Sequence, residues 1–95
     1  IVYFELLRRD YRVNIGKYGN AEVDFVARKN DILTYFQVTA DMTSETTFER
    51  EMRPLRQIKD NYEKIILTLD QYTPGNYDGI RVINIIDWLF SNNLE

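Results

Sequence analysis

Apolar side chains recur along this chain with two different periods, which separate helical segments from strands. A period of 3.6 residues indicates an amphipathic helix, and a period of two indicates a strand with one buried face. Residues 1–10 follow the helical period, because four apolar side chains form one arc of the helical wheel: Val2, Tyr3, Leu6 and Leu7. The sequence therefore predicts a helix at the start of the chain.

Three strands are predicted after this helix. Residues 11–15 and 21–28 alternate between apolar and polar side chains, whereas residues 32–40 are almost continuously apolar, as in a strand buried on both faces. Residues 16–20 have the composition of a turn. Asn30-Asp31 indicates a tight hairpin turn, so we expect the second and third strands to pair.

Strict alternation in residues 21–28 assigns each side chain to one face of the sheet. One face would carry Val23, Phe25 and Ala27, and the other would carry Glu22, Asp24 and Val26. Aspartate is disfavoured in strands, so the position of Asp24 needs a structural or functional reason.

The second half of the chain predicts a helix at residues 44–59. Apolar side chains recur there at helical spacing, at Phe48, Met52, Leu55 and Ile58. Thr43 or Ser44 is suited to cap the start of this helix. Pro54 lies inside the pattern and lacks a backbone donor, so we expect a kink or a break there.

Two more strands and a closing helix complete the predicted elements. Residues 64–69 and 80–83 are apolar and indicate strands, and residues 71–79 have the composition of a long loop. Asn84 is suited to cap a last helix at residues 85–92.

The order of elements, α-β-β-β-α-β-β-α, predicts an α/β fold with a mixed central sheet of about five strands flanked by helices. Residues 44–59 would connect two parallel strands. We expect one domain at residues 1–93, because 95 residues provide a single modest core. The absence of an initiator Met predicts a fragment of a longer protein, and residues 94–95 are interpreted as a tag remnant.

The amino-acid composition limits the kinds of catalytic and binding site that this chain can form. The chain has no Cys and no His, which excludes thiolate and imidazole ligands and the Ser/His and Cys/His catalytic pairs. Its net charge of −3 argues mildly against a free-standing nucleic-acid-binding protein. No apolar run is long enough to span a membrane, so we expect no membrane contact and a cytoplasmic location.

Carboxylate and amide oxygens remain as candidate ligands for a hard cation such as Mg²⁺, which needs only one or two carboxylates beside its waters. Pairing of the second and third strands would bring the side chains of Asp24 and Gln37 together, beside the carbonyl of Val38. Glu5 on the first helix could hold a bridging water or a second ion. Such a centre would activate a water and neutralise charge at a phosphodiester.

This arrangement resembles the PD-(D/E)xK nuclease-like superfamily, also called restriction-endonuclease-like, over residues 1–70. The resemblance is carried by three stretches, Tyr3–Arg9, Glu22–Val26 and Tyr35–Thr39. It implies a restriction-endonuclease-like core in which Glu5 is the helix acid and Asp24 is the metal-binding aspartate.

A longer resemblance is to the C-terminal domain of unknown function of prokaryotic AAA-type ATP-binding proteins. It adds the stretches Arg50–Leu55 and Ile58–Tyr62. It implies an ATPase module upstream in the same chain, where ATP would bind. Consistently, these residues contain no phosphate-binding loop of the G-x-x-x-x-G-K-[ST] type.

The resemblance to the nuclease superfamily is incomplete at two positions. Gln37 occupies the position of the second acid, and Thr39 occupies the position of the lysine. An amide oxygen can still bind a metal, but a hydroxyl supplies no cation to stabilise a phosphorane-like transition state. A replacement cation, or a phosphate contact, would have to come from Lys17, Arg53 or Arg56.

Three functions remain open from the sequence. The first is a non-cleaving, nuclease-like accessory domain that contacts a partner or nucleic acid. The second is an active Mg²⁺-dependent nuclease with a migrated cation. The third is a structural or oligomerisation domain, in which Glu5 forms a helical ion pair with Arg9, and Gln37 and Thr39 are buried polar groups.

Overall fold

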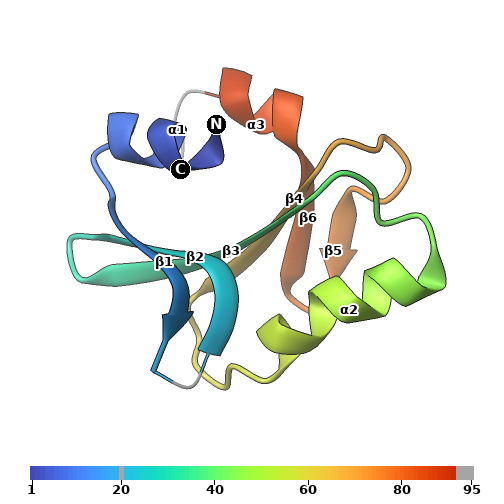
Figure 1. The fold of residues 1–95 in the computed structure, drawn as a ribbon, viewed down its shortest axis with the longest axis horizontal. Helices are drawn as coiled ribbons and strands as arrows, with labels where there is room; N and C mark the ends of the chain where they lie inside the picture. Colours follow the sequence, from blue (N-terminus) through green and yellow to red (C-terminus); the bar gives the residue numbers. More distant parts are fainter. Residues whose placement is uncertain (20, 92–95) are drawn as a thin grey trace.

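The computed structural model describes residues 1–19 and 21–91, which form three helices and one six-stranded sheet (Figure 1). The helices are α1 (Val2–Arg8), α2 (Glu45–Arg56) and α3 (Ile85–Phe90). The strands are β1 (Arg12–Tyr18), β2 (Ala21–Lys29), β3 (Ile32–Thr39), β4 (Glu63–Thr68), β5 (Gly75–Tyr77) and β6 (Ile80–Asn84). The predicted α/β class and mixed sheet are confirmed, with one strand more than expected.

The sheet has the strand order β1-β2-β3-β4-β6-β5. β3, β4 and β6 run parallel, whereas β1, β2 and β3 pair as antiparallel neighbours and β5 pairs antiparallel with β6. As predicted, the helix near residues 44–59 connects the two parallel strands β3 and β4. α2 covers one face of the sheet, and α1 and α3 lie together on the other (Figure 1).

Each face of the sheet has its own hydrophobic core. Under α2 the buried side chains are Val23, Val26, Tyr35, Met42, Met52, Leu55, Ile66, Ile80 and Val82. Under α1 and α3 they are Val2, Leu6, Ala27, Phe36, Ile65, Leu67, Ile85 and Trp88. β3 and β4 contribute to both cores, which explains their nearly continuous apolar sequence.

α2 forms largely as the sequence predicts. The Ser44 side chain caps its first turn by accepting a hydrogen bond from the Thr47 N–H at 3.2 Å. The helix continues through Pro54 rather than breaking there, but it ends at Arg56 instead of residue 59. Pro54 lies two residues before this end, so its missing N–H removes a hydrogen bond from the last turn of the helix only.

Two hairpin turns explain where the strand predictions were right and wrong. Asn30 and Asp31 both adopt positive φ and connect β2 to β3, as predicted. Asp78 and Gly79 also adopt positive φ, and their turn joins β5 to β6. β5 was therefore missed inside the expected loop at residues 71–79, because a three-residue edge strand has almost no periodic signal.

Other boundaries differ by a few residues. β1 extends through Gly16 and Lys17, which were expected in a turn, because these residues continue to pair with β2. α3 begins at Ile85 with Asn84 as its cap, as predicted, and ends at Phe90. The expected end of this helix at residue 92 and the interpreted tag at residues 94–95 lie outside the described residues.

A β-bulge in β2 overturns the predicted assignment of its faces. Ile15 pairs with Phe25, and Lys17 pairs with Glu22, so β2 has an extra residue opposite Gly16. Val23 consequently joins the core under α2, whereas Phe25 packs on the opposite face of the sheet. Strict alternation had assigned both to one face, because a bulge leaves no mark in the hydrophobic pattern.

Candidate functional site

Asp24 lies in the bulged part of β2 and contacts the neighbouring strand β3 (Ile32–Thr39). The Asp24 N–H donates to Oε1 of Gln37 at 2.9 Å, and Oδ2 of Asp24 accepts from the Val38 N–H at 2.8 Å. Regular pairing between β2 and β3 extends only to Phe25 and Phe36. Beyond this pair, hydrogen bonds that involve the side chains of Asp24 and Gln37 replace the backbone hydrogen bonds between the two strands. Asp24 thus contacts both Gln37 and Val38, but Val38 contributes its N–H here, whereas its carbonyl was the predicted metal ligand.

Gln37 connects three elements through its amide group. It is buried, and its Nε2 donates to the Glu51 carbonyl of α2 at 3.3 Å while its Oε1 accepts from Asp24. The amide thus ties β2, β3 and α2 together. An ionised carboxylate at this position could accept from Asp24 but could not donate to the Glu51 carbonyl.

Glu51 is an acidic neighbour of this contact that the sequence interpretation missed. Its side chain is only 13% exposed, and burial, followed by the charge of Asp24, raises the pKa of the Glu51 carboxyl. Arg50, at 3.9 Å, acts in the opposite direction. The signal was its spacing: Glu51 lies three residues after Phe48 and four before Leu55, at the edge of the buried stripe.

The remaining candidates on this side are engaged elsewhere. The Thr39 hydroxyl donates to the Asp41 carbonyl at 3.3 Å, in the loop after β3. Lys17 lies 3.9 Å from Glu22 on exposed strand ends.

The two predicted phosphate contacts of α2 lie in its last turn. Arg56 pairs with Glu49 at 2.9 Å, and Arg53 is exposed. The cation that lies beside Glu51 is instead Arg50, at 3.9 Å.

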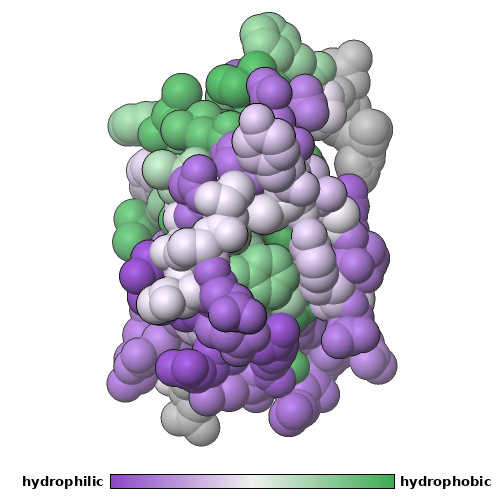
Figure 2. Space-filling model, turned by 90° about the vertical axis from the view of Figure 1, so that its right-hand side faces the viewer, coloured by the Kyte–Doolittle hydropathy of each residue, from purple (hydrophilic) through white to green (hydrophobic). Residues whose placement is uncertain are grey.

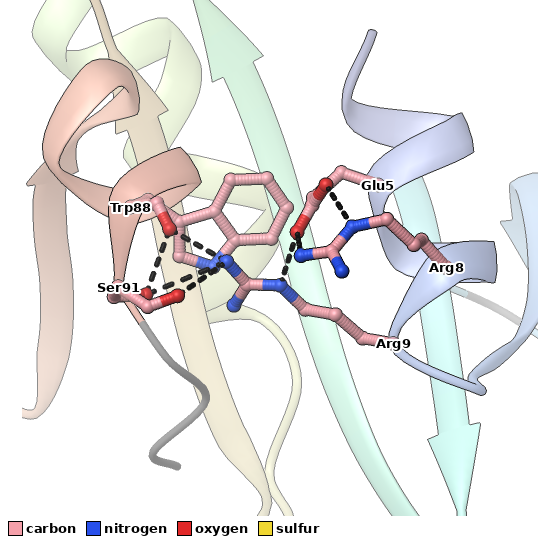
Figure 3. A network of polar contacts seen from close by, with 5 residues as sticks. All are labelled: Glu5, Arg8, Arg9, Trp88 and Ser91. Carbon is pink, nitrogen blue, oxygen red and sulfur yellow. Dashed lines mark hydrogen bonds and ion pairs between the residues drawn. The ribbon is translucent and has the colours of Figure 1, made fainter.

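Glu5, the expected helix acid, belongs to the other face of the sheet. Its helix α1 packs with α3 on the face opposite α2 (Figure 1). Oε1 and Oε2 of Glu5 accept from Arg8 at 3.0 and 2.8 Å, and Oε2 also accepts from Arg9 Nε at 2.6 Å (Figure 3). Hydrogen bonds from Arg8 and then Arg9 lower the pKa of Glu5 to about 2.

Arg9 extends this network from α1 to α3. Its Nη2 donates to the Trp88 carbonyl at 2.7 Å and to the Ser91 carbonyl at 3.2 Å, and its guanidinium stacks 4.5 Å from the Trp88 ring (Figure 3). The predicted ion pair between Glu5 and Arg9 is therefore present, and it helps to hold two helices together. The sheet separates Glu5 from Asp24 and Gln37.

The oxygens assembled here do not fit a metal cage well. Among the described residues there is no group of three or more acidic side chains that could hold a metal ion. Oδ2 of Asp24 and Oε1 of Gln37 each accept a backbone N–H, so metal binding would compete with those hydrogen bonds. These contacts connect β2 to β3 and stabilise the fold, whereas Mg²⁺ prefers oxygens that are open to the ion and its waters.

A second buried carboxylate, Asp70, organises the loop after β4. It accepts hydrogen bonds from the N–H groups of Met42, Tyr72 and Thr73, at 2.9, 2.9 and 2.8 Å, and from the Thr68 hydroxyl at 2.7 Å. These donors outweigh the effect of burial and lower the pKa of Asp70. All these bonds are internal, which indicates a structural role.

Comparison with known proteins gives one informative similarity. An uncharacterized protein of Haemophilus influenzae is 46% identical over 89 residues, which cover 94% of this chain but 22% of that protein. The chain thus spans about a fifth of the length of this relative. No protein-family model matches the chain, and no solved structure matches it. No helix among the described residues is long and apolar enough to cross a membrane.

Proposed function

We propose that this chain is a non-cleaving accessory domain of a longer protein, built on a restriction-endonuclease-like core. The observation that carries the proposal is the pair of hydrogen bonds between Asp24 and β3. Oδ2 of Asp24 and Oε1 of Gln37, two oxygens that a nuclease would offer to a metal, each accept a backbone N–H group. Glu5 is held by two arginines on the other face of the sheet.

Two further observations support the accessory role. The chain matches only 22% of a bacterial relative, which is what a unit within a longer polypeptide would give. The sequence also resembles the C-terminal domain of AAA-type ATP-binding proteins. We therefore propose that the adjoining part of the polypeptide is an upstream ATPase module that binds ATP. In this proposal the domain contacts partners, which include nucleic acid, without cutting.

A cleavage assay tests the proposal directly. The full-length polypeptide is incubated with single- and double-stranded DNA and RNA in the presence of Mg²⁺ or Mn²⁺. We expect no cleavage above that of Asp24→Ala. A matched control is Glu22→Ala, which removes an exposed carboxylate from the same strand. Cleavage that is lost in Asp24→Ala and retained in Glu22→Ala would overturn the proposal.

The second candidate function, an active nuclease with a migrated cation, is favoured by one observation. Burial and the nearby charge of Asp24 raise the pKa of the Glu51 carboxyl, and Arg50 lies 3.9 Å from Glu51. These groups would replace the second acid and the lysine of the superfamily. If cleavage is observed, Glu51→Gln and Arg50→Met should each abolish it, whereas Arg53→Met should not.

A further inference from the structure

α1 and α3 are apolar on two sides. Their inner sides bury Val2, Leu6, Ile85 and Trp88 in the core. Their outer sides expose five further apolar side chains, here called the helical patch: Ile1, Phe4, Leu7, Ile86 and Phe90. A helix that is apolar on more than its core-facing side is typical of a helix buried within a larger assembly.

The exposure of the helical patch is large. Phe4 is 72% exposed and Phe90 is 83% exposed. Ile1, Phe4 and Leu7 follow at intervals of three residues, and Ile86 and Phe90 are four apart, so each helix presents them on one face. Figure 2 shows hydrophobic surface gathered at the end of the molecule that carries these helices, whereas the opposite end is hydrophilic. Contiguous apolar surface of this kind marks an interaction site.

The two helices that carry the patch are joined to each other by a polar contact. Arg9 joins the two helices by its hydrogen bonds to Glu5 on one side and to the Trp88 carbonyl on the other (Figure 3). Its side chain is only 12% exposed. Two helices that are already joined lose less conformational entropy on docking than helices that must first be ordered.

We infer that the helical patch is the surface on which the adjoining part of the same longer polypeptide docks. The inference rests on the proposed accessory role for the existence of that part. Ile1 precedes α1, and Ser91 follows α3 and accepts a hydrogen bond from Arg9. Both ends of the described chain therefore lie in this helical layer, so polypeptide that continues from either end starts beside the patch. A tethered partner has a high effective concentration there.

Two other occupants fit these features of the surface less well. Interfacial membrane helices carry many basic residues, but α1 has a single basic residue in its last turn, Arg8, and α3 has an acidic residue in its first turn and no basic residue in its last. The net charge of −3 also disfavours an anionic membrane surface. A second copy of the chain would have to cover the patch without blocking a polypeptide that leaves from the same layer.

Hydroxyl-radical footprinting of the full-length polypeptide tests the docking surface. Phe4 and Phe90 are compared with Tyr72, an aromatic side chain in the loop after β4 that is 87% exposed. After normalisation to the rates in unfolded peptides, we expect several-fold slower labelling of Phe4 and Phe90 and near-full labelling of Tyr72. Equal normalised labelling of the three side chains would overturn the inference.

Further measurements separate the alternative occupants. Protection that falls on dilution together with the sedimentation coefficient would indicate a second copy, and protection that requires lipid vesicles would indicate a membrane; either overturns the inference.

The double variant Phe4→Ser and Phe90→Ser should restore labelling of the partner surface and speed limited proteolysis beside α1 or α3, whereas Tyr72→Ser should do neither. Asp24-dependent cleavage would end the non-cleaving proposal and leave these results unchanged.

Discussion

Replacing Arg9 with methionine tests whether the contact between α1 and α3 stabilises the fold. Methionine keeps most of the apolar stem but removes the charge and every donor. The loss comprises a 2.6 Å ion pair with Glu5, hydrogen bonds to the Trp88 and Ser91 carbonyls, and the stacking on the Trp88 ring. Glu5 keeps its bonds to Arg8, so we expect a loss of about 2–4 kcal/mol in the free energy of unfolding. The melting temperature should fall by about 8 °C or more.

Arg8→Met is the matched control, because Arg8 makes two hydrogen bonds to the same carboxylate. Arg8 contributes most to lowering the pKa of Glu5, but its side chain is 69% exposed, and both of these hydrogen bonds stay within α1. Solvent screens such a pair, so we expect a much smaller change. Urea unfolding of both variants, followed by circular dichroism, measures the difference. Equal losses in Arg8→Met and Arg9→Met would refute the role of the interhelical contact.

The cost of Arg9→Met should also depend on pH. The pKa of Glu5 is lowered to about 2 in the fold, against about 4.3 in an unfolded chain. A carboxylate with a depressed pKa stabilises the fold fully above its unfolded pKa, and this contribution is lost as the pH falls through the folded pKa. The difference between wild type and Arg9→Met should therefore be constant near neutral pH and shrink between about pH 4 and pH 2. A difference that does not change over this range would contradict the assignment.

Three other substitutions have defined outcomes. Gln37→Glu, which restores the acid of the nuclease motif, should cost about 1–3 kcal/mol, because the Glu51 carbonyl loses its donor and faces a carboxylate; unchanged urea stability would refute this. Glu51→Gln should stabilise the fold at pH 7, since burial and Asp24 raise the pKa of Glu51, and the gain should vanish as the pH falls below the ordinary glutamate pKa; a pH-independent effect would argue against it. Asp70→Asn should cost about 2–5 kcal/mol, because an amide group would face backbone donors; a melting temperature within error of wild type would show that the loop does not depend on these bonds.

Much of the fold follows from local pattern. The segments of helical and strand period became helices and strands at the expected places, and the Asn30-Asp31 turn formed the expected hairpin. The misses are short or irregular. β5 is three residues long, and the bulge in β2 moved Val23 to the face opposite its predicted one. Neither feature changes hydrophobic periodicity enough to be detected.

The candidate site was predictable only in part. The expected hairpin brings Asp24 and Gln37 close together, because its register leaves both residues next to the last regular pair of β2 and β3. The position of Glu5 was not predictable, because the side of the sheet on which α1 packs depends on the whole chain. Glu51 was overlooked for a similar reason, since it lies at the edge of the buried stripe and only packing against β3 shows that it is enclosed.

The sequence by itself determined the alternation of helices and strands, the central position of the apolar strands and the contact between Asp24 and Gln37. These follow from periodicity and turn chemistry, which act over a few residues. Only the tertiary structure decided that the oxygens of Asp24 and Gln37 bond to backbone N–H groups, that Glu5 holds two helices on the opposite face, and that an apolar patch remains on those helices. Such features depend on contacts between residues far apart in the chain, such as Arg9 with Trp88, which no local pattern specifies.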